Sequence, residues 1–452
     1  MSTIIKWNKR WLFFLGIALG FFLLNCAYHM HVSSARFSFH TQGKLEYSVW
    51  PRFESESPIN NVLFRSECVR AVNYSLTGLS YIKSQWSRSK NPVCQKYYNK
   101  FTSIFTLDSR KATLVIPALF QTKVRGWLAN NEHLYQEIFD QDIIHIVNEF
   151  SREHTVFNPL RDKRPIQPPE QSELEYFDDL LKSTAKTCDF CDFKNFTAED
   201  TFGRVESTHA FSASNIFKIE SLHAVLALKQ HDPLHWSLEV FLDLFRLTET
   251  WIKKAHTHNP QARYPALIWD VLPKCGASQV HPHLQLVLDL ERYHGEIEAW
   301  RKGAQEYYNI HNSNYFTDLV AVYSALNLTV TYGSAVAFAS LVPKRDHEMV
   351  VMAREPNTDF YTLLYLVLRA FVDDLHKMCY SMGLAYPAVD TQEGRLPIFA
   401  RTITRGYVTD MRSDVSSFEM FLATNVNIDP YKTIDIVKNS MNQKLKNMNL
   451  QV

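Results

Sequence analysis

Hydrophobic positions in the second half of the chain follow strand and helix periodicities in an order that occurs twice. The first copy has an amphipathic helix at about 237–255 and predicted strands at 210–217, 223–228, 264–271 and 281–288. The second copy has a helix at about 359–382 and predicted strands at 334–341, 347–352, 397–403 and 417–423, with 347–352 matching 223–228. Such a repeat predicts two related modules, which we place at residues 151–300 and 301–437. The expected fold class is α+β, with an antiparallel sheet and packed helices in each module, fused through one core.

The N-terminal end has a different pattern, because an apolar run follows a basic tail. Residues 1–10 carry Lys6, Lys9 and Arg10, and the run at 11–30 has about the length that crosses a bilayer. Positive residues before such a run predict a cytosolic N-terminus and a transmembrane signal anchor, with a cleaved signal peptide as the alternative. We therefore expect a single-pass type II membrane protein of the secretory pathway, in the Golgi or the endoplasmic reticulum.

Two further regions flank the modules. Residues 31–150 are expected to form a luminal stem or accessory region, with a strand at 112–120 and a helix near 132–150. Residues 438–452 are polar and are expected to form a peripheral tail.

A luminal location is compatible with three N-glycosylation sequons, which begin at Asn73, Asn195 and Asn327. It also allows Cys68 and Cys94 to form a disulfide.

Seven cysteines are too few for a disulfide scaffold in a chain of 452 residues. Because 48 Lys and Arg balance 47 Asp and Glu, no nucleic-acid partner is expected.

The candidate chemistry lies on the segment that begins at Gly276 and runs into the predicted strand at 281–288. His281, His283 and Gln285 alternate with apolar residues, so their side chains share one face of the strand. Imidazoles suit attack on phosphorus and metal binding, and an amide can hold a phosphoryl oxygen. An isolated H-x-H pattern more often belongs to a half-buried strand whose histidines are incidental. The neighbouring motifs must therefore show whether these histidines are functional.

A C-x-x-C motif at Cys188 and Cys191 follows a predicted acidic helix at 170–181. In a secreted chain this motif indicates a disulfide, a redox pair or half of a zinc site. The motif by itself leaves these alternatives open.

Taken in order, five motifs resemble those of galactose-1-phosphate uridylyltransferases, which belong to the histidine-triad superfamily. They are Asn158-Pro159-Leu160, the basic segment 161–165, C-x-x-C, His231, and the G-A-S-Q-x-H-P-H-L-Q segment at 276–285. The G-A-S-Q part is also similar to diadenosine tetraphosphate phosphorylases. The resemblance covers about residues 150–430 and implies two fused histidine-triad-like modules, the first catalytic and the second substrate-binding.

The resemblance implies a role for individual residues of the first module. His283 would be the nucleophile that attacks the α-phosphorus of a nucleotide donor, and Gln285 would contact the phosphoryl oxygens. Ser278 and Gln279, in the turn before the strand, would hold the same phosphate. Arg161 and Arg164 match a basic pair of the family and would add positive charge, although a solvated basic loop is an equal alternative.

Other matching positions depart from the family. Asp270 stands where the family has a nucleotide-contacting asparagine. Glu419 matches a hexose-contacting glutamate, and Asn425 replaces a glutamine. The family's second metal site is missing, because Ala400-Arg401-Thr402 has no H-x-H.

The resemblance also implies a structural zinc ion, held by Cys188, Cys191, His231 and His281. His235 is the substitute ligand if His231 is not one, and a disulfide between the two cysteines remains the alternative. Family members often dimerise, so a homodimer is possible.

Together these features predict a membrane-anchored luminal transferase. It would move a nucleotidyl or phospho group from a nucleotide-activated donor, such as a nucleotide sugar, through a covalent histidine intermediate. The acceptor would be a glycan or a lipid head group. The alternatives are a nucleotide phosphorylase or hydrolase, or a luminal binding protein without turnover.

Overall fold

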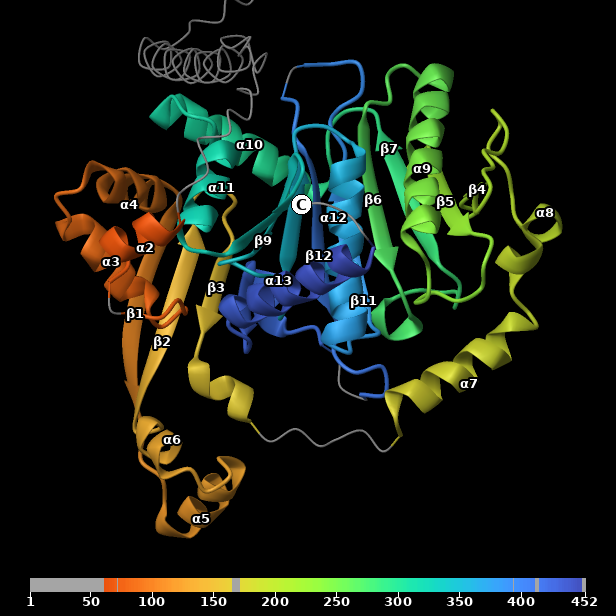
Figure 1. Ribbon diagram of the computed structural model, residues 1–452. Helices are drawn as coiled ribbons and strands as arrows, with labels where there is room; N and C mark the ends of the chain where they lie inside the picture. Colours follow the sequence, from red (N-terminus) through yellow and green to blue (C-terminus); the bar gives the residue numbers. More distant parts are fainter. Residues whose placement is uncertain (1–60, 71, 165–170, 393, 411–413, 449–452) are drawn as a thin grey trace, which may run out of the picture. The chain divides into compact units, whose positions relative to one another are not determined.

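The two repeated modules share one antiparallel sheet (Figure 1). In this computed structural model the described residues are 61–70, 72–164, 171–392, 394–410 and 414–448. The nine strands follow the order β4-β5-β7-β6-β11-β12-β10-β9-β8. Their bounds are β4 Ala210–Ser214, β5 His223–Leu228, β6 Tyr264–Asp270, β7 His283–Asp289, β8 Thr329–Tyr332, β9 Ala335–Ala339, β10 Met349–Ala353, β11 Tyr380–Ala385 and β12 Ile398–Thr404.

Strands β6 and β11 join the modules at the middle of this sheet, with Ile268 opposite Gly383 and Asp270 opposite Ser381. Helices α9 (Leu238–His258) and α12 (Thr358–Arg369) lie along one face of the sheet (Figure 1). Strands such as β5 and β10 are buried at every position, which explains their continuous apolar sequences. The predicted α+β class and the fusion through one core are therefore confirmed.

Helix α9 illustrates how local sequence sets an element. Ser237 precedes the helix, and its hydroxyl accepts a hydrogen bond from the amide of Val240, which satisfies one of the free N–H groups at the helix start. Phe241, Phe245 and Trp251 then recur at helical spacing on the buried face. The amphipathic pattern thus fixes the side of the helix that packs on the sheet.

The residues before 158 form a second sheet that includes a strand from the far end of the chain. Its order is β1-β2-β3-β13, with bounds β1 Phe105–Thr113, β2 Asp140–Asn148, β3 His154–Phe157 and β13 Ala423–Val426. β13 runs parallel to β3, and the other pairs are antiparallel. Phe64, Trp86 and Phe105 belong to the same hydrophobic core as the modules. The described part of 31–150 is thus packed onto the modules, and the expected boundary at 150 falls inside this sheet.

The remaining helices of the described residues lie before, between and after the strands of the two sheets. A disulfide between Cys68 and Cys94 joins α2 to α4, as the sequence allowed. The α-helices are α2 Asn61–Cys68, α3 Leu79–Arg88, α4 Pro92–Ile104, α5 Ala118–Trp127, α6 Glu132–Glu137, α7 Glu173–Ala185, α8 Phe193–Phe196, α10 Gly295–His311, α11 Tyr315–Ala325 and α13 Pro430–Asn447. Short 3-10 turns are η1 Pro159–Lys163, η2 Asp189–Asp192, η3 Pro273–Cys275 and η5 Ser417–Phe421, and η4 (Ala370–Asp374) is a π turn.

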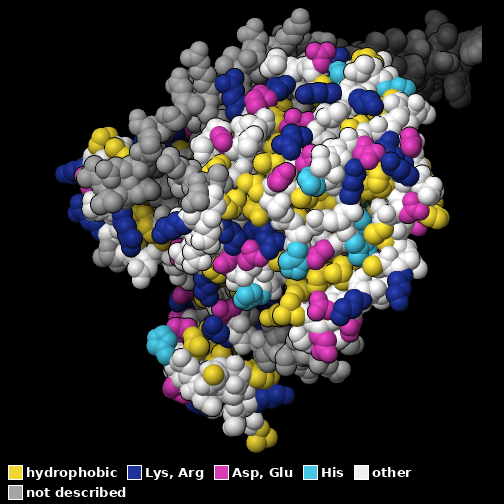
Figure 2. All heavy atoms as spheres, turned by 45° about the vertical axis from the view of Figure 1, so that its right-hand side comes forward, with side chains coloured by type: hydrophobic (Ala, Val, Ile, Leu, Met, Phe, Trp, Pro, Cys, Tyr) yellow, Lys and Arg dark blue, Asp and Glu magenta, His cyan; other side chains and the backbone are white. Residues whose placement is uncertain are grey.

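The hairpin of β1 and β2 carries α5 and α6 at its tip, at the lower end of Figures 1 and 2. Val124, Leu128 and Tyr135 form a small core there, separate from the main one. Val115 and Leu119 are 92% and 99% exposed, so the tip presents apolar side chains to solvent.

Several elements of the structure differ from those expected from the sequence, and strand pairing explains most of the differences. The helix expected at 359–382 ends at Arg369, and 380–385 is instead β11, which pairs on both sides with β6 and β12. The helix expected near 132–150 is present only as α6 (Glu132–Glu137), and most of the remainder is β2, which is paired along its full length with β1. Residue-to-residue pairing between strands decides these segments more strongly than their local periodicity.

Three smaller corrections concern chain ends and turns. The strand expected at 112–120 is the end of β1 followed by α5, and the strand expected at 417–423 is η5 followed by β13. The expected peripheral tail is helical as far as Asn447, because Met441 and Leu445 continue the buried stripe of α13. The anchor expected at 11–30 lies outside the described residues. Within those residues, no helix combines the length and the apolarity that crossing a bilayer requires.

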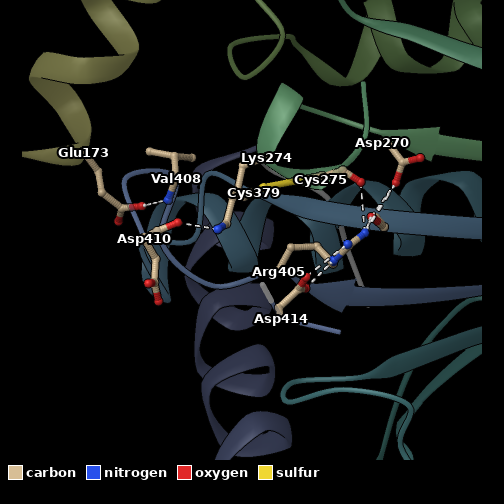
Figure 3. Close-up of a disulfide and its surroundings, with 10 residues drawn as sticks. Glu173, Asp270, Lys274, Cys275, Cys379, Arg405, Val408, Asp410 and Asp414 are labelled. Atoms are coloured by element: carbon tan, nitrogen blue, oxygen red, sulfur yellow. Dashed lines mark hydrogen bonds and ion pairs between the residues drawn. A yellow bond between two sulfur atoms is a disulfide. The ribbon is translucent and has the colours of Figure 1, made fainter. Parts of the chain in front are cut away.

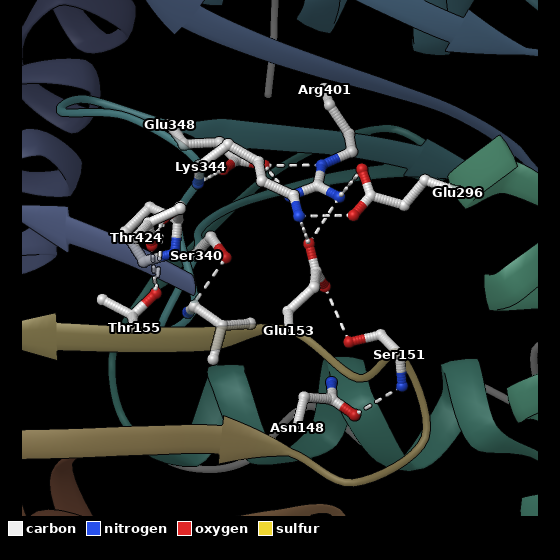
Figure 4. Close-up of polar contacts among 12 residues, drawn as sticks. Asn148, Ser151, Glu153, Thr155, Glu296, Ser340, Lys344, Glu348, Arg401 and Thr424 are labelled. Atoms are coloured by element: carbon white, nitrogen blue, oxygen red, sulfur yellow. Dashed lines mark hydrogen bonds and ion pairs between the residues drawn. The ribbon is translucent and has the colours of Figure 1, made fainter. Parts of the chain in front are cut away.

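A buried ion-pair network connects the second sheet to the second module (Figure 4). The guanidinium of Arg401, on β12, lies 2.6 Å from Glu348 and 2.6 Å from Glu153, whose side chains are 0% and 3% exposed. Glu296 of α10 lies 3.5 Å from Arg401 and 2.5 Å from Lys344. Burial by itself would lower the pKa of Arg401, but the surrounding carboxylates raise it by more. The net pKa therefore lies above its ordinary value, and the guanidinium stays charged.

Replacing Arg401 with methionine should destabilise the protein by about 3–5 kcal/mol, because two buried carboxylates would lose their cation. Urea unfolding measures the change. The matched control is Arg110→Met, since Arg110 and its partner Asp108 are 62% and 50% exposed, and the loss of that pair should cost less than about 1 kcal/mol. Equal losses in the two variants would contradict a stabilising role for the network.

Candidate active site and metal centre

A cavity of about 520 Å³ lies on the face of the sheet opposite α9 and α12. Its floor consists of β7, β6, β11 and β12, and the first turns of α10 line it through Glu296 and Trp300. Gln285 and Asp270 line the part from the first module, and Arg401 lines the part from the second. The cavity therefore spans the join between the modules.

His283 is the first residue of β7, on the same face as Gln285, and it is 7% exposed. Its Nδ1 lies 2.7 Å from the carbonyl oxygen of His281, so Nδ1 carries the proton and donates it. The other nitrogen, Nε2, then has a free lone pair. Burial lowers the pKa of His283, which favours the neutral, nucleophilic ring.

Phe190, from the turn between the two cysteines of the C-x-x-C motif, packs its ring centre 5.2 Å from that of His283 and 5.5 Å from that of His281. His283 does not line the cavity itself, whereas its neighbour Gln285 does. The expected place of His283 on the floor of a cleft is therefore not observed: its ring packs against Phe190, outside the cavity lining, with little of its surface exposed.

Gln285 has a partner that we did not predict from the sequence. Its Oε1 lies 3.1 Å from Nε2 of His223, on the neighbouring strand β5, and 3.4 Å from the side-chain nitrogen of Asn215. His223 is 1% exposed. The local sequence gave no signal, because His223 is one histidine at the start of an apolar strand.

The side chains of Cys188, Cys191, His231 and His281 meet beside the start of β7. Nδ1 of His281 lies 3.3 Å from Sγ of Cys188 and 3.4 Å from Nδ1 of His231, and Nδ1 of His231 lies 3.4 Å from Sγ of Cys191. The edge of a tetrahedron is about 1.6 times its centre-to-corner distance, so zinc bonds of about 2.0–2.3 Å correspond to edges of about 3.3–3.8 Å. The four residues therefore fit one tetrahedral metal ion.

The outer nitrogens of both histidines have partners, as metal-ligating histidines require. Nε2 of His281 donates to the carbonyl oxygen of Leu228 at 2.6 Å, which leaves Nδ1 for the metal. Nε2 of His231 lies 3.3 Å from the hydroxyl of Thr184. His235, the substitute ligand, instead pairs with Asp232 at 2.8 Å.

The G-A-S-Q turn is held to the second module by a disulfide between Cys275 and Cys379 (Figure 3). Gly276 has φ +115°, a backbone conformation that residues with a Cβ rarely adopt, so the turn favours glycine. Asp270 accepts a hydrogen bond from Ser381 at 2.5 Å and lies 3.8 Å from Arg405. Ser278 is exposed and Gln279 half-buried, and neither lines the cavity.

The remaining predicted substrate contacts lie outside the cavity lining. Arg161 is on η1, and Arg164, which directly follows η1, donates to the side chain of Asn427 at 3.2 Å. Glu419 pairs with Arg345 and accepts from the amide of Ser416, and the amide of Asn425 donates to the carbonyl oxygen of Val156. Their substrate-binding roles stay predictions.

The three sequon asparagines differ in accessibility. Asn73 and Asn195 are exposed, and Asn195 donates to the carboxylate of Asp192. Asn327 is half-buried and bonds Lys438 through its side-chain oxygen at 2.9 Å.

Comparison with known proteins gives likeness in structure alone. No family model and no curated protein matches the chain. Among solved structures, ADP-glucose phosphorylase from Arabidopsis thaliana with bound ADP-glucose is 14% identical, with a TM-score of 0.50 over 64% of this chain and 96% of that one. A uridylyltransferase is 15% identical, with a TM-score of 0.48 over 67% and 99% of the two chains. A GalT-like protein from Arabidopsis thaliana is 15% identical, with a TM-score of 0.46 over 56% and 91%.

Of these three structures, the plant ADP-glucose phosphorylase carries the likeness in fold. The chain has the fold of the plant phosphorylase, with two modules fused in one sheet. Identities near 15% establish no activity or substrate.

We expect the purified protein to retain about one zinc ion per chain after dialysis against a weak chelator. His231→Ala should lose the metal, whereas His235→Ala should keep it, because His235 faces Asp232. Elemental analysis by mass spectrometry measures the content. Equal zinc in both variants, or a Cys188–Cys191 disulfide in mapped peptides, would contradict this metal site.

Proposed function

We propose that the chain is an enzyme that transfers a nucleotidyl or phospho group from a nucleotide-activated donor through a covalent intermediate on His283. The observation that carries the proposal is the hydrogen bond from Nδ1 of His283 to the carbonyl oxygen of His281. It leaves the Nε2 lone pair free on a neutral, buried ring, beside an amide that lines the cavity.

The first step forms a bond between Nε2 and the α-phosphorus of the donor and breaks the bond from that phosphorus to the leaving oxygen. The leaving group departs as a phosphate ester with the electron pair of the broken bond. The phosphorylated ring retains its Nδ1 proton and carries positive charge, which the carbonyl of His281 stabilises. In the second step an acceptor oxygen attacks the same phosphorus, and the bond from Nε2 to phosphorus breaks, so that Nε2 recovers its lone pair. An acceptor that attacks as a hydroxyl gives its proton to solvent.

A donor that presents its distal phosphorus to Nε2 would pass on a phospho group by the same exchange of bonds. The cavity extends from Gln285 to Arg401, so one donor can contact both modules.

Zinc at Cys188, Cys191, His231 and His281 would have a structural role, because four protein ligands close the tetrahedron. By holding His281, the set also holds the carbonyl oxygen that orients the ring of His283. The protein's own residues carry out both chemical steps.

We also propose that the enzyme acts in the lumen of the secretory pathway and is held there by the apolar segment 11–30. The disulfides Cys68–Cys94 and Cys275–Cys379 support this location, since such bonds persist in oxidising compartments. A luminal acceptor would be a glycan or a lipid head group.

A second candidate function is phosphorolysis, in which inorganic phosphate is the acceptor. The fold shared with ADP-glucose phosphorylase favours it. Product analysis with and without inorganic phosphate separates the two. A nucleoside diphosphate that forms only with added phosphate indicates a phosphorylase, and transfer to an organic acceptor indicates a transferase.

Zinc-loaded protein incubated with α-³²P-labelled ADP-glucose, UDP-glucose and CDP-alcohols should acquire acid-labile, base-stable label. His283→Ala should lose at least about 1,000-fold in labelling, since its Nε2 is the atom that forms the bond to phosphorus in the proposed step. His133→Ala is the control, because its side chain is 83% exposed on α6. Absence of label with every α-labelled and β-labelled donor would overturn the enzymatic proposal and favour a binding role.

A further inference from the structure

The amide of Gln285 can lie in two orientations, and only one of them presents its NH₂ group to the cavity. The two differ by a 180° flip that exchanges oxygen and nitrogen, so the neighbouring hydrogen bonds have to decide between them. His223 and Asn215 make those hydrogen bonds, and both belong to the β4–β5 connection and its following strand.

A backbone amide fixes the proton of His223. The N–H of Ile219 can only donate, and it lies 3.2 Å from Nδ1 of His223. Nδ1 must therefore be the acceptor, and in the neutral ring the proton is on Nε2. Nε2 then donates to Gln285 over 3.1 Å, which requires the oxygen of Gln285 at that position.

A second backbone amide fixes Asn215 in the same way. The N–H of Phe217 donates to Oδ1 of Asn215 at 2.9 Å, so the NH₂ group of Asn215 points the other way. That group lies 3.3 Å from Nε2 of His223, which carries the proton and cannot accept, and 3.4 Å from Oε1 of Gln285, which can accept. Two donors thus converge on the oxygen of Gln285, and its own NH₂ group remains for a ligand in the cavity.

The second module also has a polar pair at the equivalent register. Gln285 stands opposite Val225 on β5, and its partner His223 is two residues before Val225. Arg401 stands opposite Val350 on β10, and its partner Glu348 is two residues before Val350. In each module the residue two positions before the one directly opposite bonds the side chain that lines the cavity. These bonds are His223 to Gln285 and Glu348 to Arg401.

We propose that His223 is a positioning residue, which holds the Gln285 amide with its NH₂ group toward the phosphoryl oxygens of the donor. The inference rests on the proposed function and deepens it. His223 touches no reacting atom, and its effect passes entirely through Gln285.

The test is a double-mutant cycle on the full-length, zinc-loaded protein, read as the rate of labelling by α-³²P-labelled ADP-glucose and UDP-glucose. His223→Leu should lower the maximal rate about 10- to 100-fold, and Gln285→Ala about 100-fold. The double variant should equal Gln285→Ala within about 2-fold, because His223 has no route to the donor except that amide. His223→Gln, whose amide can donate to the same oxygen, should return to within about 5-fold of the parent.

His256→Leu is the matched control. His256 is half-buried on α9 and bonds the carbonyl oxygen of Ala262, so it loses a comparable hydrogen bond away from the cavity. Its labelling rate should match that of the parent. Unfolding by urea is measured on every variant, so that a loss of rate is compared only among folded proteins.

The outcomes separate the inference from the function. If His223→Leu labels like the parent, or if its effect multiplies with that of Gln285→Ala, the positioning role is overturned and the labelling chemistry stands. If the parent takes no label, the same cycle is read as dissociation constants for AMP and UMP. Non-additive loss of binding then supports the positioning role without the covalent step, and additive loss overturns it. A parent that neither takes label nor binds either nucleotide overturns both proposals.

Discussion

The pairing of β6 with β11 is the contact on which the rest of the architecture depends. Each module contributes one strand to this pair. The hydrogen bonds between β6 and β11 join the four strands of the first module to the five strands of the second in one sheet. The cavity lies over this join, so its floor exists only when both modules are in register. A shift by one residue would turn Asp270 and Ile268 to the helix-covered face. The disulfide between Cys275 and Cys379 lies at the end of the same pair and holds that register covalently.

The two modules use one geometry for different chemistry. In the first, a neutral histidine holds a neutral amide, and in the second, a buried carboxylate holds a guanidinium. The guanidinium also contacts Glu153, in the turn between β2 and β3, and Glu296 on α10. Its charge therefore links the second sheet and α10 to β12. The second copy has Arg401 at the position where the first has its H-x-H motif. There Arg401 links the second sheet to the second module through Glu153.

The sequence contained the parts of the site that depend on short-range spacing. His283 and Gln285 are two residues apart on one strand, and the strand period alone places them on one face. The Cys and His set required the order of motifs as well, because His231 is far from Cys188 along the chain. His223 and Glu153 were missed, since their roles depend on which strands become neighbours. Matching the repeats by residue type paired His223 with His347, whereas the strand register pairs His223 with Glu348.

The fold could be predicted where periodicity and pairing agree, as in β5, β7 and α9. It could not be predicted at β11 and β2, whose sequences have helix-like spacing and whose partners lie on other parts of the chain. Arg161, Glu419 and Asn425 were assigned through the resemblance alone, and the side chains of Glu419 and Asn425 contact other residues of this protein.

The parallel pairing of β3 with β13 has a consequence for the order in which the chain folds. Thr155 and Thr424 share a hydrogen bond although they are 269 residues apart. At about 5–20 residues per second, a ribosome needs roughly 15 to 50 seconds to synthesise that stretch. During this time one edge of β3 has no partner strand, and unpaired edges promote aggregation. Translation past residue 426 therefore ends a vulnerable interval, and chaperones would be needed most before it.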